Sequence, residues 1–194
     1  MTGGAGRGPV GADPPGAGPS DDGLVVVVAG GDPVPPAAVA DLPAGVPVVA
    51  ADSGVDHAVA LGLVVTEAVG DFDSVTPAGL ARAEAAGAAL DRHPAAKDET
   101  DLELALDRAL ARGARRVVVV GGHGGRTDHF LANALLLTSD RYAAVAVEAR
   151  FGAARVHVLR GGGPATAVAL RGRPGDLVSL LAVAGAAEGV WTEG

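Results

Sequence analysis

The sequence predicts an α/β protein with an open, mostly parallel sheet over residues 23–142, followed by a smaller all-β, sandwich-like region over residues 143–194. Apolar runs of strand length alternate with amphipathic segments of helix length from about residue 24 to residue 140. This alternation is typical of a parallel sheet covered by helices. After residue 143 only short strand-like runs follow, separated by Gly and Pro turns, and they indicate the second region.

The first half of the α/β part opens with a strand over residues 24–29, because the run Leu-Val-Val-Val-Val-Ala is apolar throughout. Glycine and proline residues mark the ends of most elements. The helix over residues 77–86 has Thr76 as its N-cap and Pro77 at its first position. The other elements predicted before residue 92 are helices over residues 35–42 and 55–61 and strands over residues 46–50, 68–69 and 88–91.

The second half begins with a helix over residues 99–111, in which Leu and Ala side chains recur at the 3.6-residue period. We expect Asp98 to cap this helix and Gly113 to end it. A buried strand over residues 117–120 and a helix over residues 127–137 complete the α/β part.

The all-β region has no segment with a helical period. Its predicted strands are residues 144–149, 155–159, 165–170, 177–182 and 187–190. At the other end of the chain, residues 1–22 are rich in Gly, Pro and Ala without periodicity, and we expect this segment to be disordered.

The composition excludes several classes of protein. The 194 residues contain no cysteine, which excludes disulfides, zinc–thiolate sites and thiol nucleophiles. The net charge of −8 argues against a nucleic-acid partner. No apolar run is long enough to cross a membrane. Because the N-terminus lacks a basic and then apolar leader pattern, we expect a cytoplasmic protein.

The first of two acidic clusters follows the strands of the predicted sheet. Asp71 and Asp73 come after the strand at residues 68–69, and Asp52 comes after a neighbouring strand, so all three lie at the edge where ligands bind in α/β folds. In an extended stretch Asp71 and Asp73 face the same way, and a cation between them would relieve their repulsion. Oxygen ligands suit Mg²⁺. The alternative interpretation is a solvated acidic turn.

The second acidic cluster lies where the helix over residues 99–111 begins. Asp98 and Asp101 are three residues apart and share a helix face, so Asp98 can cap the helix while Asp101 reaches a metal. The alternative is capping and dipole compensation alone. The cluster also holds Lys97, the only lysine beside fourteen arginines. Its compact ammonium suits phosphate oxygens, although chance would also explain its position.

A glycine-rich segment over residues 121–125 connects a predicted strand to a helix. Its backbone N–H groups, such as that of Gly122, can approach a nucleotide there. The segment is neither a P-loop nor a dinucleotide fingerprint, and alone it is a weak signal. Arg126, which can pair with phosphate oxygens, and Asp128 strengthen it. We expect His123 in this segment and His129 after it to be structural or to face solvent.

Four segments, taken in order, resemble thiamine pyrophosphokinase (thiamine diphosphokinase). They are Ala-Asp-Ser-Gly at residues 51–54, Gly-Asp-Phe-Asp-Ser at 70–74, Lys-Asp-Glu-Thr-Asp at 97–101, and Gly-Arg-Thr-Asp-His at 125–129 followed by Asn133. Each segment alone is a weak signal, but four in order are specific. The resemblance extends over about residues 24–190.

This resemblance implies an α/β catalytic domain, a β-sandwich domain and a homodimer. It also implies a reaction in which ATP donates its terminal diphosphate to the hydroxyl of thiamine, giving thiamine diphosphate and AMP. ATP and thiamine are then the small-molecule partners, and Mg²⁺ is the cofactor.

The resemblance also assigns residues by their position in the motifs. The implied Mg²⁺ ligands are Asp71, Asp73 and Asp101. The implied ATP-site residues are Thr100, Arg126 and Asp128, to which we add Asp52, Lys97 and Gly122. Lys97 and Arg126 would offset charge on the transferred group. Either Asp98 or Asp128 would orient or accept the hydroxyl proton, and the sequence does not choose between these two carboxylates.

One departure from the family concerns the C-terminal end. In the family a further strand and a Ser-rich stretch help to form the thiamine pocket across the dimer, whereas this sequence ends at Trp191-Thr192-Glu193-Gly194. We therefore expect an incomplete β-sandwich, and a chain that binds Mg-ATP more securely than thiamine.

Two other functions remain open from the sequence. The first is a pterin pyrophosphokinase, which would use the same chemistry with 6-hydroxymethyl-pterin as the acceptor. The second is a nucleotide-binding regulatory module without catalysis. The complete set of carboxylates argues against the second, because a pure binding module has little need for four positioned acids.

Overall fold

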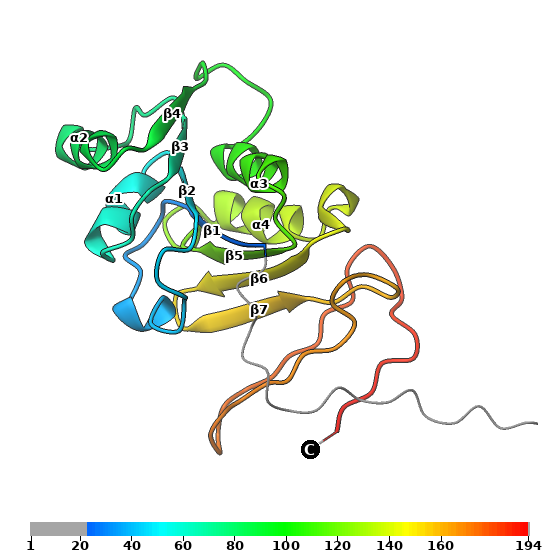
Figure 1. Ribbon diagram of the computed structural model, residues 1–194. Helices are drawn as coiled ribbons and strands as arrows, with labels where there is room; N and C mark the ends of the chain where they lie inside the picture. Colours follow the sequence, from blue (N-terminus) through cyan, green and yellow to red (C-terminus); the bar gives the residue numbers. More distant parts are fainter. Residues whose placement is uncertain (1–22, 194) are drawn as a thin grey trace, which may run out of the picture.

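The structure is a computed structural model that describes residues 23–193, and its centre is a seven-stranded sheet (Figure 1). The strands are β1 (Leu24–Val28), β2 (Val48–Ala51), β3 (Glu67–Gly70), β4 (Ala89–Arg92), β5 (Arg116–Val120), β6 (Ala146–Phe151) and β7 (Ala154–Val158). Their order in the sheet is β4-β3-β2-β1-β5-β6-β7. All neighbours pair in parallel except β6 and β7. The predicted open, mostly parallel sheet is therefore confirmed.

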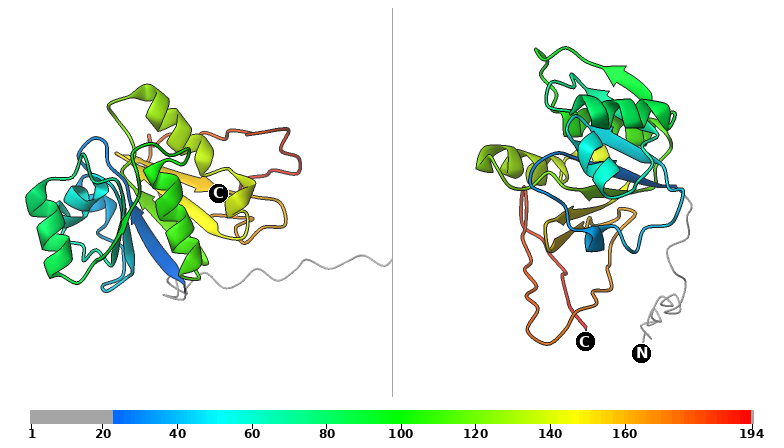
Figure 2. Two further views of the ribbon diagram at one scale, coloured as in Figure 1. Left: turned by 90° about the horizontal axis from the view of Figure 1, so that it is seen from above. Right: turned by 90° about the vertical axis from the view of Figure 1, so that its left-hand side faces the viewer.

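Four α-helices cover the two faces of this sheet. They are α1 (Gly54–Ala60), α2 (Pro77–Ala85), α3 (Asp101–Ala111) and α4 (Thr127–Leu136). Figures 1 and 2 show α1 and α2 on one face and α3 and α4 on the other. Thr76 caps α2 as predicted, because its hydroxyl accepts a hydrogen bond from Gly79 N–H.

Two short 3₁₀ turns complete the helical elements, Pro36–Ala38 and Asp140–Tyr142. The predicted helix over residues 35–42 was wrong, because only the first of these turns forms there. This turn buries a single side chain, that of Ala38, and so offers a longer helix little packing to stabilise it.

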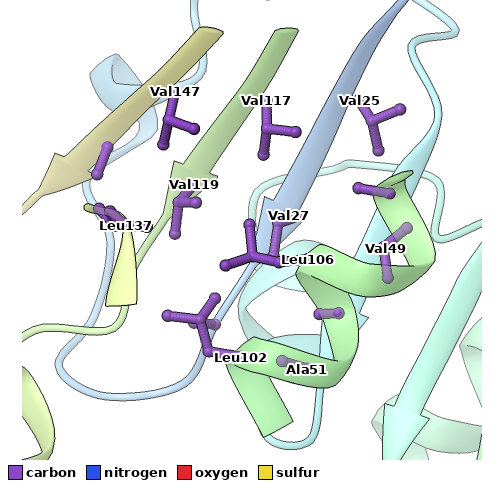
Figure 3. Close-up of a cluster of buried hydrophobic side chains, with 14 of the residues drawn as sticks. Val25, Val27, Val49, Ala51, Leu102, Leu106, Val117, Val119, Leu137 and Val147 are labelled. Carbon is purple, nitrogen blue, oxygen red and sulfur yellow. The ribbon is translucent and has the colours of Figure 1, made fainter. Parts of the chain in front are cut away.

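The core consists of two apolar layers, one on each face of the sheet. In the first, Leu102 and Leu106 of α3 lie against valines of β1, β2 and β5, among them Val27 and Val119 (Figure 3). In the second, Val55 of α1 packs against the opposite faces of the central strands. The central strands are buried on both faces, which explains their uninterrupted valine runs.

The strand order changes direction between β1 and β5. From β1 the chain builds outward through β2, β3 and β4, and it then returns to the other side of β1 with β5 and β6. In such a sheet, ligands bind beyond the carboxyl ends of the strands at this switch point. Every loop that carries a predicted site residue lies at this edge or at the start of α3.

The strands predicted over residues 144–149 and 155–159 form as β6 and β7, but they belong to the α/β sheet and not to an all-β region. β6 pairs in parallel with β5, from Arg116 opposite Ala146 to Val120 opposite Arg150. β7 returns antiparallel along β6. The physical reason is burial: β6 is covered on both faces over most of its length and therefore behaves as an interior strand of the first sheet.

Residues 159–193 form neither helix nor strand in the described part of the chain, so the strands predicted over 165–170, 177–182 and 187–190 do not form there. Several large apolar side chains in this stretch face solvent: Leu177 is 96% exposed, Leu181 85% and Trp191 77%. A β-sandwich would bury these side chains against a second sheet. The β domain predicted for this region is therefore a proposal that their exposure supports.

Two further predictions concern the chain as a whole. The predicted disorder of residues 1–22 lies outside the described residues. Within residues 23–193, no helix has the length and apolar character needed to cross a membrane.

Candidate functional site

Three carboxylates from two neighbouring loops converge at the carboxyl edge of the sheet. Asp52 follows β2, and Asp71 and Asp73 follow β3. One oxygen of each carboxylate lies within 4.8 Å of the others. The parallel register explains this approach, because Ala51 lies opposite Val69 and Asp52 N–H donates to the Val69 carbonyl at 2.9 Å. The geometry groups Asp52 with the predicted metal pair.

The backbone of these loops is unusual at two non-glycine residues. Asp52 has φ +43° and Phe72 has φ +62°, in the left-handed region that few side chains adopt. Phe72 is buried, with the Arg92 guanidinium 4.9 Å from its ring centre. Asp71 and Asp73 therefore converge around a left-handed residue, and the predicted extended stretch was wrong. A hydrogen bond from Asp73 N–H to Asp71 Oδ1 (3.2 Å) closes this turn.

Asp101, the third predicted metal ligand, lies beside this cluster at the start of α3. Gly70 allows the approach: it has φ +146°, and a Cβ there would lie 3.2 Å from both Asp101 Oδ1 and the Asp52 side chain. The Asp101 oxygen is engaged by Lys97, whose Nζ lies 2.9 Å away. Sequence reasoning missed the role of Gly70, although a glycine directly before an acidic pair was a usable signal.

The helix that carries Asp101 begins two residues later than predicted. The hydroxyl of Thr100 accepts from Glu103 N–H at 3.1 Å, so Thr100 is the N-cap and the prediction of Asp98 was wrong. Thr100, predicted as an ATP-site residue, thus has a structural role in the described chain. Asp98 is exposed in the preceding turn, where it forms no hydrogen bond or ion pair with the residues described.

The electrostatics of the cluster fit a hard cation. Burial raises the pKa of Asp52, and the neighbouring carboxylates of Asp101, Asp71 and Asp73 raise it further. Asp52 Oδ1 is buried and has no hydrogen-bond partner among the described residues, an arrangement that costs free energy unless a ligand satisfies it. A set of carboxylate oxygens without nitrogen or sulfur suits Mg²⁺.

We expect the substitution Asp52→Asn to raise the unfolding free energy of the metal-free chain by about 1 kcal/mol, because it removes a buried charge among like charges. Asn tolerates the left-handed backbone at this position. The same variant should lose most of the stabilisation that Mg²⁺ gives to the unsubstituted chain. Urea unfolding with EDTA and with Mg²⁺ checks both effects.

Glu84→Gln is the matched control, because it removes one negative charge from an exposed position on α2. It should change neither value measurably. A metal-free Asp52→Asn chain that is less stable than the unsubstituted chain would contradict the argument.

The glycine-rich loop after β5 is tied to the loop after β1. Gly122 N–H donates to the Gly30 carbonyl at 2.7 Å, and the Gly122 carbonyl accepts from the Asn133 side chain at 3.0 Å. Gly122 therefore holds the loop in place, and its N–H, which already donates to Gly30, is not available to a phosphate as we expected. Its φ of +77° explains the glycine.

Arg126 and Asp128 lie at the start of α4, at the same edge of the sheet. They form an ion pair with Arg126 Nη2 2.5 Å from Asp128 Oδ2, and both side chains are exposed. The hydrogen bond from Arg126 lowers the pKa of Asp128 to about 2. A second hydrogen bond, from Arg126 Nε to Asp128 Oδ1, makes the contact bidentate, the geometry that a guanidinium also uses for phosphate.

His123 and His129 differ in environment. His129 is exposed. The ring of His123 lies against Gly152, and a Cβ added to Gly152 would lie 3.0 Å from His123 Nε2. The Nδ1 atom of His123 is buried and has no hydrogen-bond partner among the described residues.

Comparison with known proteins places this site in a family. Residues 46–147 match the thiamin pyrophosphokinase catalytic domain. Thiamine pyrophosphokinase of Bacillus subtilis is 45% identical over 86 residues, which make up 44% of this chain and 40% of that protein.

Solved structures agree with this match. The crystal structure of thiamine pyrophosphokinase from Bacillus subtilis has a TM-score of 0.57 at 32% identity, covering 66% of this chain and 60% of its own. A thiamin pyrophosphokinase family protein from Enterococcus faecalis has a TM-score of 0.53 at 33% identity, covering 66% and 61%. The chain thus spans less than two thirds of the length of these relatives. Because the family match takes in more than half of its residues, the chain belongs to the thiamin pyrophosphokinase family.

Proposed function

We propose that this chain transfers the terminal diphosphate of ATP to the hydroxyl of thiamine, giving thiamine diphosphate and AMP. The observation that carries the proposal is the convergence of Asp52, Asp71 and Asp73 at the carboxyl edge of the sheet, in a chain of this family.

The carboxylate cluster would hold Mg²⁺. Asp52, Asp71 and Asp73 supply oxygens close enough to share one ion, and Asp101 is the fourth carboxylate beside them. Mg²⁺ bound there would draw charge from the phosphate oxygens of ATP, which is the main electrostatic contribution to this kind of transfer.

In the proposed reaction the thiamine hydroxyl attacks the β-phosphorus of ATP. The bond from this phosphorus to the oxygen that bridges it to the α-phosphate breaks, and AMP leaves with that oxygen. The protein contributes positioning and charge neutralisation. Lys97 and Arg126 are the cations that we assign to the phosphates.

The proton of the thiamine hydroxyl needs an acceptor. Asp128 is a poor one, because Arg126 lowers its pKa to about 2. We therefore assign Asp128 the task of orienting the Arg126 guanidinium, and this choice leaves Asp98 as the proposed acceptor. Asp98 is exposed and unpaired within the described residues, so a bound substrate can approach it.

We further propose a cytoplasmic homodimer as the working form. Large apolar side chains such as Leu177 and Trp191 are exposed on residues 159–193, and an assembled β-sandwich would bury them. This part of the proposal also bears on thiamine, because the resemblance implies that the β-sandwich contributes to the thiamine pocket.

The test is AMP formation from ATP and Mg²⁺ by the purified chain, with thiamine, with 6-hydroxymethyl-pterin, or with no acceptor. We expect AMP and thiamine diphosphate in equal amounts with thiamine only. AMP formation with the pterin only would show that 6-hydroxymethyl-pterin, and not thiamine, is the acceptor. Mg-ATP binding without AMP formation under any of these conditions would overturn the proposal in favour of a binding module.

A further inference from the structure

Lys97 occupies an unusual place for the only lysine of the chain. It lies in the loop between β4 and α3, yet its side chain is only 11% exposed. Its ammonium lies 2.9 Å from Asp101 Oδ1. The Pro94 carbonyl, 3.4 Å from Nζ, is its other polar contact in the described structure. The ammonium therefore lies against Asp101, the carboxylate beside the cluster, with little competition from other acceptors.

The surrounding charges hold Lys97 in this place. The Asp101 carboxylate attracts the ammonium at a distance of 2.9 Å. The ammonium thus neutralises part of the same charge that a divalent metal would neutralise. A metal and the ammonium cannot both lie against one carboxylate oxygen without repulsion.

We propose that Lys97 is a tethered cation that pairs with Asp101 beside the carboxylate cluster in the metal-free chain, and that metal binding displaces its ammonium toward the phosphates of the nucleotide. The inference rests on the proposed function for the identity of the metal and nucleotide. It adds a coupling: the same lysine opposes metal binding before the nucleotide arrives and supports nucleotide binding afterwards.

The coupling gives Lys97 two opposite effects that a structural lysine would not have. In Lys97→Met, which keeps the length of the side chain but removes its charge, Mn²⁺ should bind the nucleotide-free chain about tenfold more tightly. In the same variant, α,β-methylene-ATP with saturating Mg²⁺ should bind about tenfold more weakly, because a phosphate contact is lost. Lys97→Arg should restore the unsubstituted values within a fewfold.

The experiment measures free Mn²⁺ by electron paramagnetic resonance in titrations of the unsubstituted chain, Lys97→Met, Lys97→Gln and Arg112→Met. Arg112 is the C-cap of α3 and pairs with Glu67 at 3.0 Å, away from the carboxylate cluster, so its variant removes one positive charge from the opposite end of this helix. Circular dichroism of each variant confirms that it folds, and Lys97→Gln replaces Lys97→Met if the latter does not.

Tighter Mn²⁺ binding in each Lys97 variant that folds, but not in Arg112→Met, supports the inference. Unchanged or weaker Mn²⁺ binding in folded Lys97 variants overturns it, as does equal tightening in Arg112→Met, which would show a general effect of net charge. Failure of all chains to bind Mn²⁺ overturns it together with the metal site. Absence of thiamine-dependent AMP, with the Mn²⁺ response intact, removes only the proposed function.

Discussion

We expect the substitution Asp73→Asn to lower the rate of thiamine-dependent AMP formation by about 100- to 1000-fold at low Mg²⁺. The substitution removes one of three converging carboxylates, and a metal at such a site contributes several kcal/mol to the stabilisation of charge on the phosphates, where each 1.36 kcal/mol is tenfold in rate. Asp73 is exposed and its Oδ1 contacts only the Ser74 hydroxyl among side chains, so the fold should tolerate the change.

Initial rates over a series of Mg²⁺ concentrations separate binding from chemistry. The deficit should shrink as Mg²⁺ rises if the substituted amide side chain still ligates weakly, because higher metal concentration compensates for a lower affinity. Glu84→Gln, which removes an equal charge from the surface of α2, should keep the full rate. A rate for Asp73→Asn within threefold of the unsubstituted chain at every Mg²⁺ concentration would remove the carboxylate cluster from the mechanism.

The α/β sheet was largely predictable because its signals are local. The valine run of β1 and the Thr76–Pro77 start of α2 depend on neighbouring residues only, and the structure reproduces both. The start of α3 was equally local, since Thr100 and Glu103 have the spacing of a capping box. That signal was available in the sequence, and choosing Asp98 overlooked it.

The arrangement of the site depends on features that sequence reasoning could not supply. The register that sets Ala51 opposite Val69 brings Asp52 to the acidic pair, and register follows from the packing of the whole sheet. Phe72 adopts a left-handed backbone conformation, which its residue type does not predict. The prediction that β6 belongs to an all-β region was wrong for a related reason. A buried strand has the same apolar pattern whichever sheet it joins.

The same sheet contains a buried ion-pair network, and we expect its central residue to have the largest effect on stability. Arg150 on β6 is 3% exposed, and it donates to Glu148, itself 7% exposed, and to the Ala38 carbonyl. Asp41 completes its contacts. Arg150→Ala takes the most deeply buried partner from the Glu148 carboxylate, which keeps Arg116 at 3.0 Å. It also leaves the Ala38 carbonyl without its donor. We therefore expect a loss of about 3 kcal/mol in unfolding free energy. Urea unfolding at pH 7 measures it.

Arg155→Ala is the matched control, because Arg155 pairs with the same two carboxylates, Asp41 and Glu148, from a side chain that is 49% exposed. Its loss should cost less than about 1 kcal/mol. Equal costs for the two variants would show that burial does not decide the strength of this network.

The pH dependence of the Arg150→Ala deficit identifies the ion pair as its cause. Burial alone would raise the pKa of Glu148, but Arg150 and its neighbours hold it below the ordinary 4.5. A lowered pKa contributes stability that is present above pH 4.5 and is lost as the pH falls further. The difference in unfolding free energy between Arg150→Ala and the unsubstituted chain should therefore narrow when the measurement is repeated below pH 4.5. A constant difference would assign the cost to lost packing of the arginine stem.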